Sequence, residues 1–547
     1  ANPSLEAMPN RLGRVAWGRG DEGPARHTQS WTGLSEVAKA DAHTPALAAT
    51  HPGLGLAVVM IGVLITAVDT TIVVLALPEI QRSLHVALGD VIWIVIGYLF
   101  VITLLATQVG RLGDMFGRVR MYEAGFAIFI TGSALCALAW DQGSIVGFRV
   151  VQGVGGALMA ANSMAVIADL FPPSRRGRAY GYNGVGWSVG AVLGIVVGGA
   201  IVTYVSWRWI FWINVPIGAI GLALAIRVLR DTGRRVKHRL DLAGMATLGA
   251  GLFGVLWAVT RLATSSFDAV TTSSLVGGIV LVAVFALVEC RRAAPMLNLS
   301  LLKVPTVTPT LLAALTQGLA NFAVLFLVIM YLQGPRGMSP IHASLLLVPG
   351  YVVGSAMGPA AGRLSDKIGP VIPATAGLAV QVIALFVYSR LSLGTGLWVV
   401  VVASVLNGIG ASSFFPSNSA ALMKAVRPQV FGIASGMLRT FANIGMVFSF
   451  SMAILVASRS ISRGLAFAIF VGTAKLHGTV ASAFTTGLHS AFYASMIVMA
   501  VAAALSATRS ARSARDRLSA QVPAIPTTGS LEESPAGDGS ALASPKP

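Results

Sequence analysis

The chain has 547 residues, of which 55% are Ala, Val, Ile, Leu, Met, Phe, Trp, Tyr or Cys and only 11% are charged. A soluble domain carries about 25% charged residues, so this composition excludes a water-soluble globule and predicts an all-α membrane protein. The net charge of +18 would suggest a nucleic-acid partner in a soluble protein, but a basic inner face beside an anionic leaflet explains it without nucleic acid.

Residues 1–52 are polar and rich in Gly, Pro and charge, and they predict a disordered cytoplasmic tail; residues 509–547 predict a second one. Between the tails, apolar runs of about 20 residues are long enough to cross ~30 Å of hydrocarbon. They predict fourteen transmembrane helices, at 54–78, 90–109, 119–140, 144–170, 180–204, 209–229, 241–262, 271–290, 307–332, 341–362, 371–390, 396–423, 431–457 and 486–508.

An even number of crossings places both termini on one side of the membrane. On that side the predicted loops hold nineteen Lys and Arg residues, whereas the opposite loops hold eight. Because basic loops stay in the cytoplasm, this bias predicts cytoplasmic termini in a multi-pass plasma (inner) membrane protein. The stretch from Arg459 to His489 is predicted to be a long outer loop.

A short sequence occurs twice, as GRLGDMFGR at 110–118 and as GRLSDKIG at 362–369. Each copy follows the second helix of a possible six-helix half. The repeat therefore predicts two pseudo-symmetric six-helix bundles, at 53–230 and 293–508, with a two-helix insert at 231–292.

The repeated sequence is also a candidate conformational latch. Its glycines permit a tight turn, and its carboxylates can accept hydrogen bonds from Arg side chains or helix N-termini. A static loop contact is the alternative. The candidate latch residues are Gly110, Arg111, Asp114, Gly117, Arg118, Gly362, Asp366 and Gly369.

Charges within the predicted spans are costly and therefore point to function. Asp69 lies in the middle of the first span, where a carboxylate can either make a structural polar contact or bind and release a proton. Arg149, in the fourth span, is its expected basic partner. Glu123 and Asp169 lie near helix ends, where pairing with loop residues explains them better than transport.

Three further segments carry a family resemblance: DTTIVVLALP at 69–78, FRVVQGVGGA at 148–157 and WRWIFWINVP at 207–216. Together with the repeated loop, they resemble motifs of the major facilitator superfamily, and specifically of its fourteen-helix drug:H+ antiporter branch. The resemblance covers residues 54–508. It implies that Arg149 works with Asp69 in proton coupling.

One segment departs from that branch. Its antiporter motif has a proline where the segment GAVLGIVVGG at 190–199 has Ile195, so the kink attributed to the proline is in question. Close contact between helices is still expected at this segment, with ordinary small-residue packing as the alternative. The residues of this candidate helix-packing motif are Gly190, Gly194, Gly198 and Gly199.

Aromatic and amide side chains commonly hold amphipathic ligands, so some of them are candidates for a substrate cavity, with plain packing as the alternative. Arg439 is a second embedded base, and the second half offers no carboxylate at that depth. It either packs or pairs near the inner face, or it faces the cavity and favours anionic or zwitterionic substrates or lipid head groups. The cavity candidates are Trp187, Asn321, Phe322, Phe326, Asn407, Phe415, Arg439 and Asn443.

Other chemistries lack their signals. The sequence has no GxxxxGK[ST] motif, its His residues lack metal-ligand spacing, and Cys136 and Cys290 lie in apolar runs, so no catalytic, metal or cofactor site is expected. We expect a proton-coupled antiporter for multidrug efflux and antibiotic resistance, which exports hydrophobic or amphipathic drugs by alternating access. A monomer suffices, and protons are the coupling ion. The alternatives are a dedicated exporter of one lipid, metabolite or antibiotic, and a membrane sensor without transport.

Overall fold

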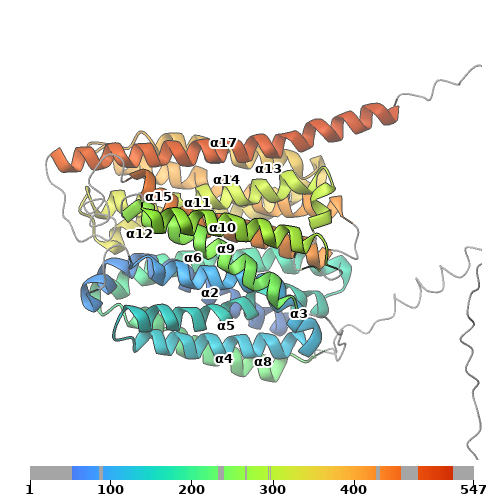
Figure 1. Ribbon diagram of the computed structural model, residues 1–547, viewed down its shortest axis with the longest axis horizontal. Coiled ribbons are helices and arrows are strands. Elements are labelled where there is room, and N and C mark those ends of the chain that lie inside the picture. Colours follow the sequence, from blue (N-terminus) through green and yellow to red (C-terminus); the bar gives the residue numbers. More distant parts are fainter. Residues whose placement is uncertain are drawn as a thin grey trace, which may run out of the picture. The chain divides into compact units, whose positions relative to one another are not determined.

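The structure is a computed structural model that describes residues 52–85, 90–231, 240–264, 268–292, 295, 297, 299–426, 431–457 and 479–521. Within these residues the regular secondary structure is helical (Figure 1). The tail predicted at 1–52 falls outside this part of the chain except for Pro52, as do loop residues 458–478 and the tail beyond 521.

The helices follow one another with short connections. They are α2 (Pro52–Leu84), α3 (Trp93–Phe116), α4 (Arg118–Ala137), α5 (Gln142–Leu170), α6 (Pro173–Tyr204), α7 (Trp209–Trp212), α8 (Asn214–Val228), α9 (Leu242–Thr264), α10 (Ala269–Glu289), η2 (Leu299–Lys303), α11 (Val307–Gln333), α12 (Pro340–Ile368), α13 (Val371–Tyr388), α14 (Leu397–Ala425), α15 (Phe431–Ala457) and α17 (Thr479–Gln521).

Within the described residues, twelve spans are long and apolar enough to cross a membrane, and α3 makes a thirteenth although it bends by 58° between Ala106 and Gln108. The helix α4 is not among them, because Arg118, Arg120 and Glu123 lower its mean hydropathy. The fourteen predicted spans are thus matched by twelve or thirteen that meet these criteria. The chain is an all-helical, multi-pass membrane protein.

Two sets of six helices repeat the same neighbour relations. In the first set α2 packs on α6, α5 packs on α3 and α4, and α8 packs on α2 and α4. In the second set α11 packs on α15, α14 packs on α12 and α13, and α17 packs on α11 and α13. The two sets meet where α6 contacts α12 and where α3 contacts α15 (Figure 1).

Glycines mark the same helix crossing in both sets. A Cβ atom at Gly155 would lie 2.8 Å from the carbonyl oxygen of Gly125, so α4 and α5 approach closely at this pair. A Cβ atom at Gly410 would lie 2.5 Å from the carbonyl oxygen of Gly377, which gives α13 and α14 the same close approach. Small residues let helix backbones meet in this way inside a membrane.

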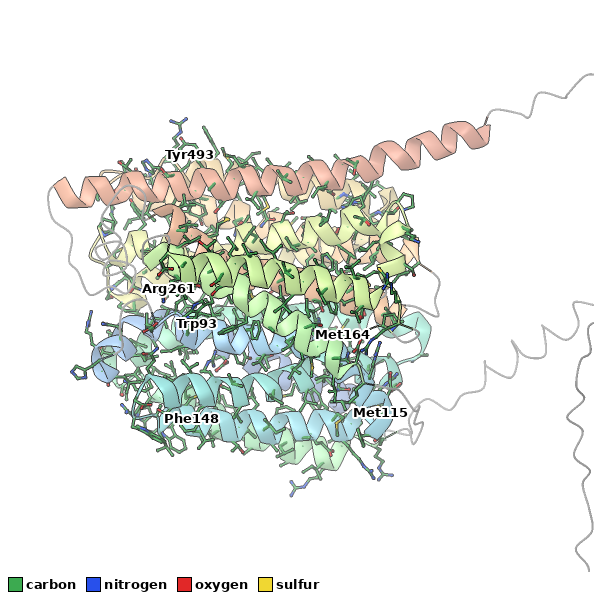
Figure 2. The ribbon with its side chains drawn as sticks, viewed as in Figure 1. Trp93, Met115, Phe148, Met164, Arg261 and Tyr493 are labelled. Atoms are coloured by element: carbon green, nitrogen blue, oxygen red, sulfur yellow. The ribbon has the colours of Figure 1, made fainter. Side chains whose placement is uncertain are left out.

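The repeated loop sequences lie mostly within helices, which differs from the expectation of loops. Helix α3 continues to Phe116 and α12 to Ile368, and the chain turns only at Gly117 and Gly369, where φ is +108° and +88°. We call the end of the bundle that holds these two glycines the motif end and the opposite end the distal end. Met115 lies toward the motif end, and Trp93, Phe148 and Arg261 lie toward the distal end (Figure 2).

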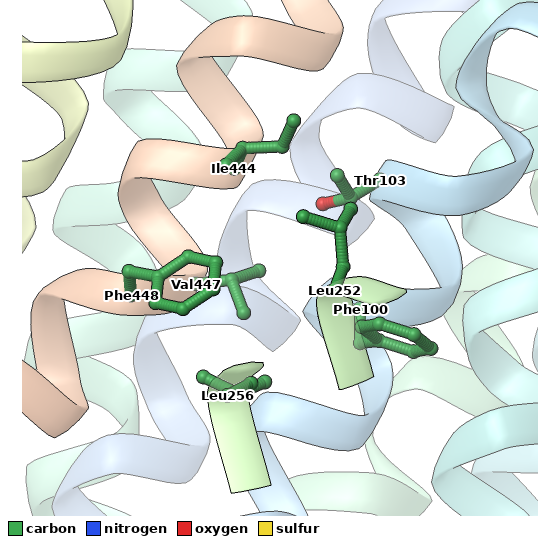
Figure 3. A pocket seen from close by; sticks show the side chains of 7 residues that line it. All are labelled: Phe100, Thr103, Leu252, Leu256, Ile444, Val447 and Phe448. Atoms are coloured by element: carbon green, nitrogen blue, oxygen red, sulfur yellow. The ribbon is translucent and has the colours of Figure 1, made fainter. Parts of the chain in front are cut away.

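Helices α9 and α10 pack on each other, and α9 also contacts both sets, through α3 and α15. On the α3 side, the ring of Trp93 lies 5.5 Å from that of Phe253 and 5.6 Å from that of Trp257. On the α15 side, the hydroxyls of Thr260 and Ser451 are 2.9 Å apart. A small apolar pocket remains where the three helices meet (Figure 3), lined by Phe100, Thr103, Leu252, Leu256, Ile444, Val447 and Phe448.

The start of α10 is held by Asp268. The Asp268 carboxylate accepts hydrogen bonds from the Thr271 backbone N–H at 2.7 Å and from Arg261 at 3.0 Å. Hydrogen bonding by Thr271, with a smaller contribution from Arg261, lowers the pKa of Asp268 to about 2. The carboxylate is therefore ionised at neutral pH, where it caps the helix N-terminus.

Helix α17 runs past the expected boundary at Thr508 as far as Gln521. Arg509, assigned from the sequence to a disordered tail, is buried. Its Nη1 donates to Asn418 Oδ1 at 2.7 Å and to Thr310 Oγ1 at 3.0 Å, and its Nη2 donates to Ser506. These contacts attach α17 to α11 and α14.

Candidate functional site

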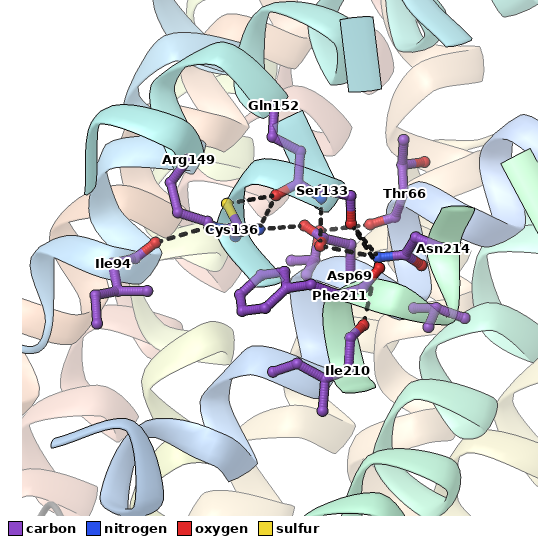
Figure 4. A network of polar contacts seen from close by, with 12 residues as sticks. Thr66, Asp69, Ile94, Ser133, Cys136, Arg149, Gln152, Ile210, Phe211 and Asn214 are labelled. Carbon is purple, nitrogen blue, oxygen red and sulfur yellow. Dashed lines mark hydrogen bonds and ion pairs between the residues drawn. The ribbon is translucent and has the colours of Figure 1, made fainter. Parts of the chain in front are cut away.

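Asp69 is the centre of a buried polar network in the first set of helices (Figure 4). It lies in α2, and its exposed fraction is 0%. Its Oδ2 accepts from Arg149 Nη1 at 2.7 Å, and its Oδ1 accepts from Gln152 Nε2 at 2.9 Å, both donors being on α5. The carboxylate thus has an ion pair and a neutral hydrogen bond from one face of α5.

Arg149 is equally buried and is held on several sides. Its Nε donates to the carbonyl oxygen of Ile94 at 3.0 Å, and its Nη1 also donates to Gln152 Oε1 at 2.7 Å. Its guanidinium carbon lies 4.1 Å from the centre of the Tyr98 ring, so a cation–π contact adds to the hydrogen bonds. Pairing and hydrogen bonding of this kind are what makes two buried charges tolerable.

A second donor group approaches Asp69 from the start of α8. Asn214 Nδ2 lies 3.4 Å from Asp69 Oδ1 and 3.2 Å from Ser133 Oγ, and Ser133 in turn donates to the carbonyl oxygen of Phe211. The thiol of Cys136 lies 3.7 Å from Gln152 Oε1. The network therefore joins α2, α4, α5 and α8 around a single carboxylate.

The glycine stripe of α6 packs against the segment of α2 that carries Asp69. A Cβ atom at Gly190 would lie 2.7 Å from Ala67 Cβ, and one at Gly194 would lie 2.7 Å from the Val68 carbonyl oxygen. Gly198 faces Ile72 in the same way. The fourth glycine of the predicted motif has another partner, because a Cβ atom at Gly199 would lie 3.0 Å from Ile341 Cα in the second set of helices.

In the second set, an uncharged cluster stands at the matching place. Gln381 Nε2, on α13, donates to Asn321 Oδ1 at 2.8 Å and to Asn407 Oδ1 at 3.2 Å. Gln317 Nε2 lies 3.5 Å from Gln381 Oε1. The cluster joins α11, α13 and α14 by amides alone.

The two copies of the repeated sequence have different surroundings. Arg118 donates to Asp114 Oδ1 at 2.9 Å and to Asp169 Oδ1 at 2.9 Å, and Arg111 donates to the carbonyl oxygen of Pro295. This connects the ends of α3, α4 and α5 at the motif end. In the second copy Asp366 is exposed, and within the described residues it makes no ion pair.

The glycines of the two copies differ as well. Gly117 and Gly369 have positive φ, which favours glycine in both copies. Gly110 and Gly362 have no atom within 4 Å of a Cβ placed on them, so neither one is required by a close helix contact.

The substrate-cavity candidates do not form one group. Asn321 and Asn407 meet through Gln381, as described above. Phe322 packs on Phe450, with ring centres 5.9 Å apart. The other candidates lie apart: Trp187 is 41% exposed, Phe415 is 48% exposed, Arg439 and Asn443 are half-buried on α15, and the side chain of Phe326 lies outside the described residues.

The sequence interpretation did not single out Gln152, Asn214 and Gln381. Two of them had a usable signal. Gln152 lies three residues after Arg149, which places it on the same helix face, and Asn214 lies in the segment 207–216 already noted for its resemblance. Gln381 had none, because a single amide in an apolar run does not reveal its partners.

Comparison with known proteins agrees with this architecture. Residues 59–450 match the family model of the Major Facilitator Superfamily. The chain is 31% identical over 428 residues to the tetracenomycin C resistance and export protein of Streptomyces glaucescens, with 76% of this chain and 78% of that protein covered. It is 29% identical to multidrug resistance protein 3 of Bacillus subtilis (strain 168) over 71% of this chain and 76% of that protein.

The fold is also similar to a solved structure. A bacterial homolog of the human lysosomal transporter Spinster, in an inward-facing and unoccupied conformation, superposes with a TM-score of 0.58 over 83% of this chain and 96% of that chain. The two sequences are 17% identical, so the likeness is one of fold. From the family match and the helical architecture together, the chain belongs to the Major Facilitator Superfamily of membrane transporters.

Proposed function

We propose that the protein is a proton-coupled antiporter of the fourteen-helix drug:H+ branch, which exports hydrophobic or amphipathic drugs across the plasma membrane. The observation that carries this proposal is the fully buried ion pair between Asp69 and Arg149. The names of relatives that confer multidrug or antibiotic resistance support the substrate class. In this proposal α4 also crosses the membrane, and the motif end and both termini face the cytoplasm.

The coupling follows from the contacts of Asp69. When the carboxylate is ionised, it holds α2 against α5 through Arg149 and Gln152. A proton on Asp69 removes the charge on which the ion pair depends, so the two protonation states favour different contacts between these helices. Helix α6 packs directly on this part of α2, so a shift of α2 reaches α12, which α6 contacts in the second set.

The amide cluster of the second set supports a single proton site. Asn321, Gln381 and Asn407 do not titrate at physiological pH. Between Arg291 and Thr508 the sequence has one acidic residue, Asp366, and it is exposed near the end of α12. In this proposal the first set carries the proton, no cofactor takes part, and one chain contains the complete machinery.

The test is proton movement in liposomes that contain a pH-sensitive dye in the lumen. When ethidium is added outside, antiport moves protons out of the lumen as the drug enters, so the lumenal pH rises. Asp69→Asn should abolish this rise. The matched control is Glu79→Gln in the same helix, because Glu79 is exposed and pairs only with its neighbour Arg82 in the described contacts. Drug entry without proton movement, or an Asp69→Asn variant that behaves like the wild type, would refute the coupling.

A second candidate is a dedicated exporter of one compound, and the name of the Streptomyces glaucescens relative, which specifies a single antibiotic, supports it. Competition separates the two candidates. Unrelated apolar drugs should inhibit ethidium entry by a broad exporter, whereas a dedicated one responds to its own ligand only.

A further inference from the structure

Arg439 extends from one set of helices toward the other. It lies within the membrane span Ile433–Ala453 of α15, in the second set, and its side chain is half-buried. Its Nη1 lies 3.4 Å from the carbonyl oxygen of Ala160 on α5, in the first set. The guanidinium is therefore located between the two sets of helices.

This guanidinium has little to neutralise it. Asp69, the buried carboxylate of the first set, is engaged by Arg149 and Gln152. Within the described part of the chain Arg439 forms no ion pair. A guanidinium has five N–H donors, and for Arg439 the described contacts use a single one, in a long hydrogen bond. The carbonyl oxygen of Ala160 also accepts from Ser163 Oγ at 2.9 Å.

The other buried arginines show what a structural role looks like in this protein. Arg149 has a carboxylate, an amide and a backbone carbonyl as acceptors. Arg509 has no carboxylate either, but Asn418, Thr310 and Ser506 accept its hydrogen bonds. Arg439 lacks such a set of acceptors, although an unsatisfied charge within a membrane is costly.

Next to Arg439 lies a second polar group without a partner in the structure. Asn443 follows one helical turn later, so it lies on the same face of α15. Its side chain is half-buried and makes no hydrogen bond to the described residues. A guanidinium beside an amide donor is suited to an oxyanion, because planar N–H groups bind both oxygens of a carboxylate.

We propose that Arg439, with Asn443, binds an anionic group of the transported substrate. This inference rests on the proposed transport function and specifies its substrate class: amphipathic molecules that carry a carboxylate or an ionised phenol. The anionic group takes the donors of Arg439 and replaces the weak contact with Ala160, so substrate binding releases a link between the two sets of helices.

The test compares two dyes that differ by one ester. Rhodamine 110 has a free carboxylate, and rhodamine 123 is its methyl ester. Binding of each dye to the full chain in lipid nanodiscs is measured by fluorescence anisotropy. The wild type should bind the acid about tenfold more tightly than the ester, which is the effect of one charge-assisted hydrogen-bonded pair. Arg439→Gln should remove this preference by weakening the acid and leaving the Kd of the ester unchanged.

Two further variants complete the design. Arg439→Lys keeps the charge without the planar fork and should retain part of the preference, which covers the case in which the Gln variant does not fold. Arg390→Gln makes the same charge change at an exposed site of the same half and should behave as the wild type. Equal affinities in the wild type, absence of binding of both dyes, or an equal loss of both in Arg439→Gln would overturn the inference.

The binding test is independent of the test of transport. If the dye preference holds while drug entry moves no protons, the anion site stands and the antiport proposal fails. If proton movement is observed but the two dyes bind alike, the antiport proposal stands and the assignment of Arg439 fails.

Discussion

Asn321 occupies in α11 the place that Asp69 occupies in α2. It follows Asp69 by the same number of residues by which Gly362 follows Gly110 in the repeated sequence. Both residues accept a hydrogen bond from a glutamine amide, Asp69 from Gln152 and Asn321 from Gln381. The duplicated architecture thus holds a charged network in one half and a neutral one in the other.

This relationship predicts different effects of substitution in the two halves. Asn321→Ala should weaken drug binding or lower stability by about 1–3 kcal/mol, because Gln381 loses a buried acceptor. It should leave the number of protons moved per drug unchanged, since no titrating group is lost. Parallel measurement of drug entry and lumenal pH in liposomes checks this, and a changed proton ratio would contradict it.

The ion pair predicts non-additive stability changes. Arg149→Gln should destabilise the protein by about 3–5 kcal/mol, because Asp69 is left buried without its cation. Adding Asp69→Asn should recover part of this loss, since the double variant has no uncompensated charge. Thermal unfolding in one detergent measures the three variants against the wild type. Strictly additive losses would show that the two side chains do not interact.

The glycine stripe predicts a steric effect that depends on position. At Gly194 a methyl group would lie 2.7 Å from the Val68 carbonyl oxygen, so Gly194→Ala must push α6 away from α2 and should cost about 1–3 kcal/mol. Gly184, on the same helix, has no atom within 4 Å of that position. Gly184→Ala is therefore the control and should unfold at the wild-type temperature. Equal effects of the two substitutions would count against direct α2–α6 contact.

The two copies of the repeated sequence should differ in their sensitivity. Arg118→Gln removes the contacts to Asp114 and Asp169, each worth about 0.2–1 kcal/mol for partly exposed pairs, and should reduce drug export from cells. Asp366→Asn should have no measurable effect, because Asp366 makes no ion pair in the described contacts. Ethidium accumulation at matched expression tests both, and a defect in Asp366→Asn alone would reverse the assignment.

The buried end of α17 predicts a stability effect beyond the last apolar run. Arg509→Leu leaves Asn418 Oδ1 and Thr310 Oγ1 without their donor and should lower the free energy of unfolding by about 1–3 kcal/mol. Asn418→Leu combined with Arg509→Leu should be less harmful, because fewer polar groups are then left unpaired. Unchanged thermal stability in Arg509→Leu would show that α17 is held by its apolar face alone.

The sequence by itself determined the membrane class, the helical architecture and the family. Hydropathy and charge are local properties, and a span of about 20 apolar residues has few alternatives to a helix in a bilayer. The embedded charges Asp69 and Arg149 were also visible, because charged residues are rare at that depth.

Only the tertiary structure decided which polar groups meet. The sequence could not show that Gln152 and Asn214 share the Asp69 carboxylate, that Arg509 is buried, or that Gly199 leaves the α2 contact for Ile341. Each of these facts depends on contacts between helices far apart in the chain. Hydropathy determines whether a segment crosses the membrane, but the direction and partners of its side chains are set by the packing of its neighbours.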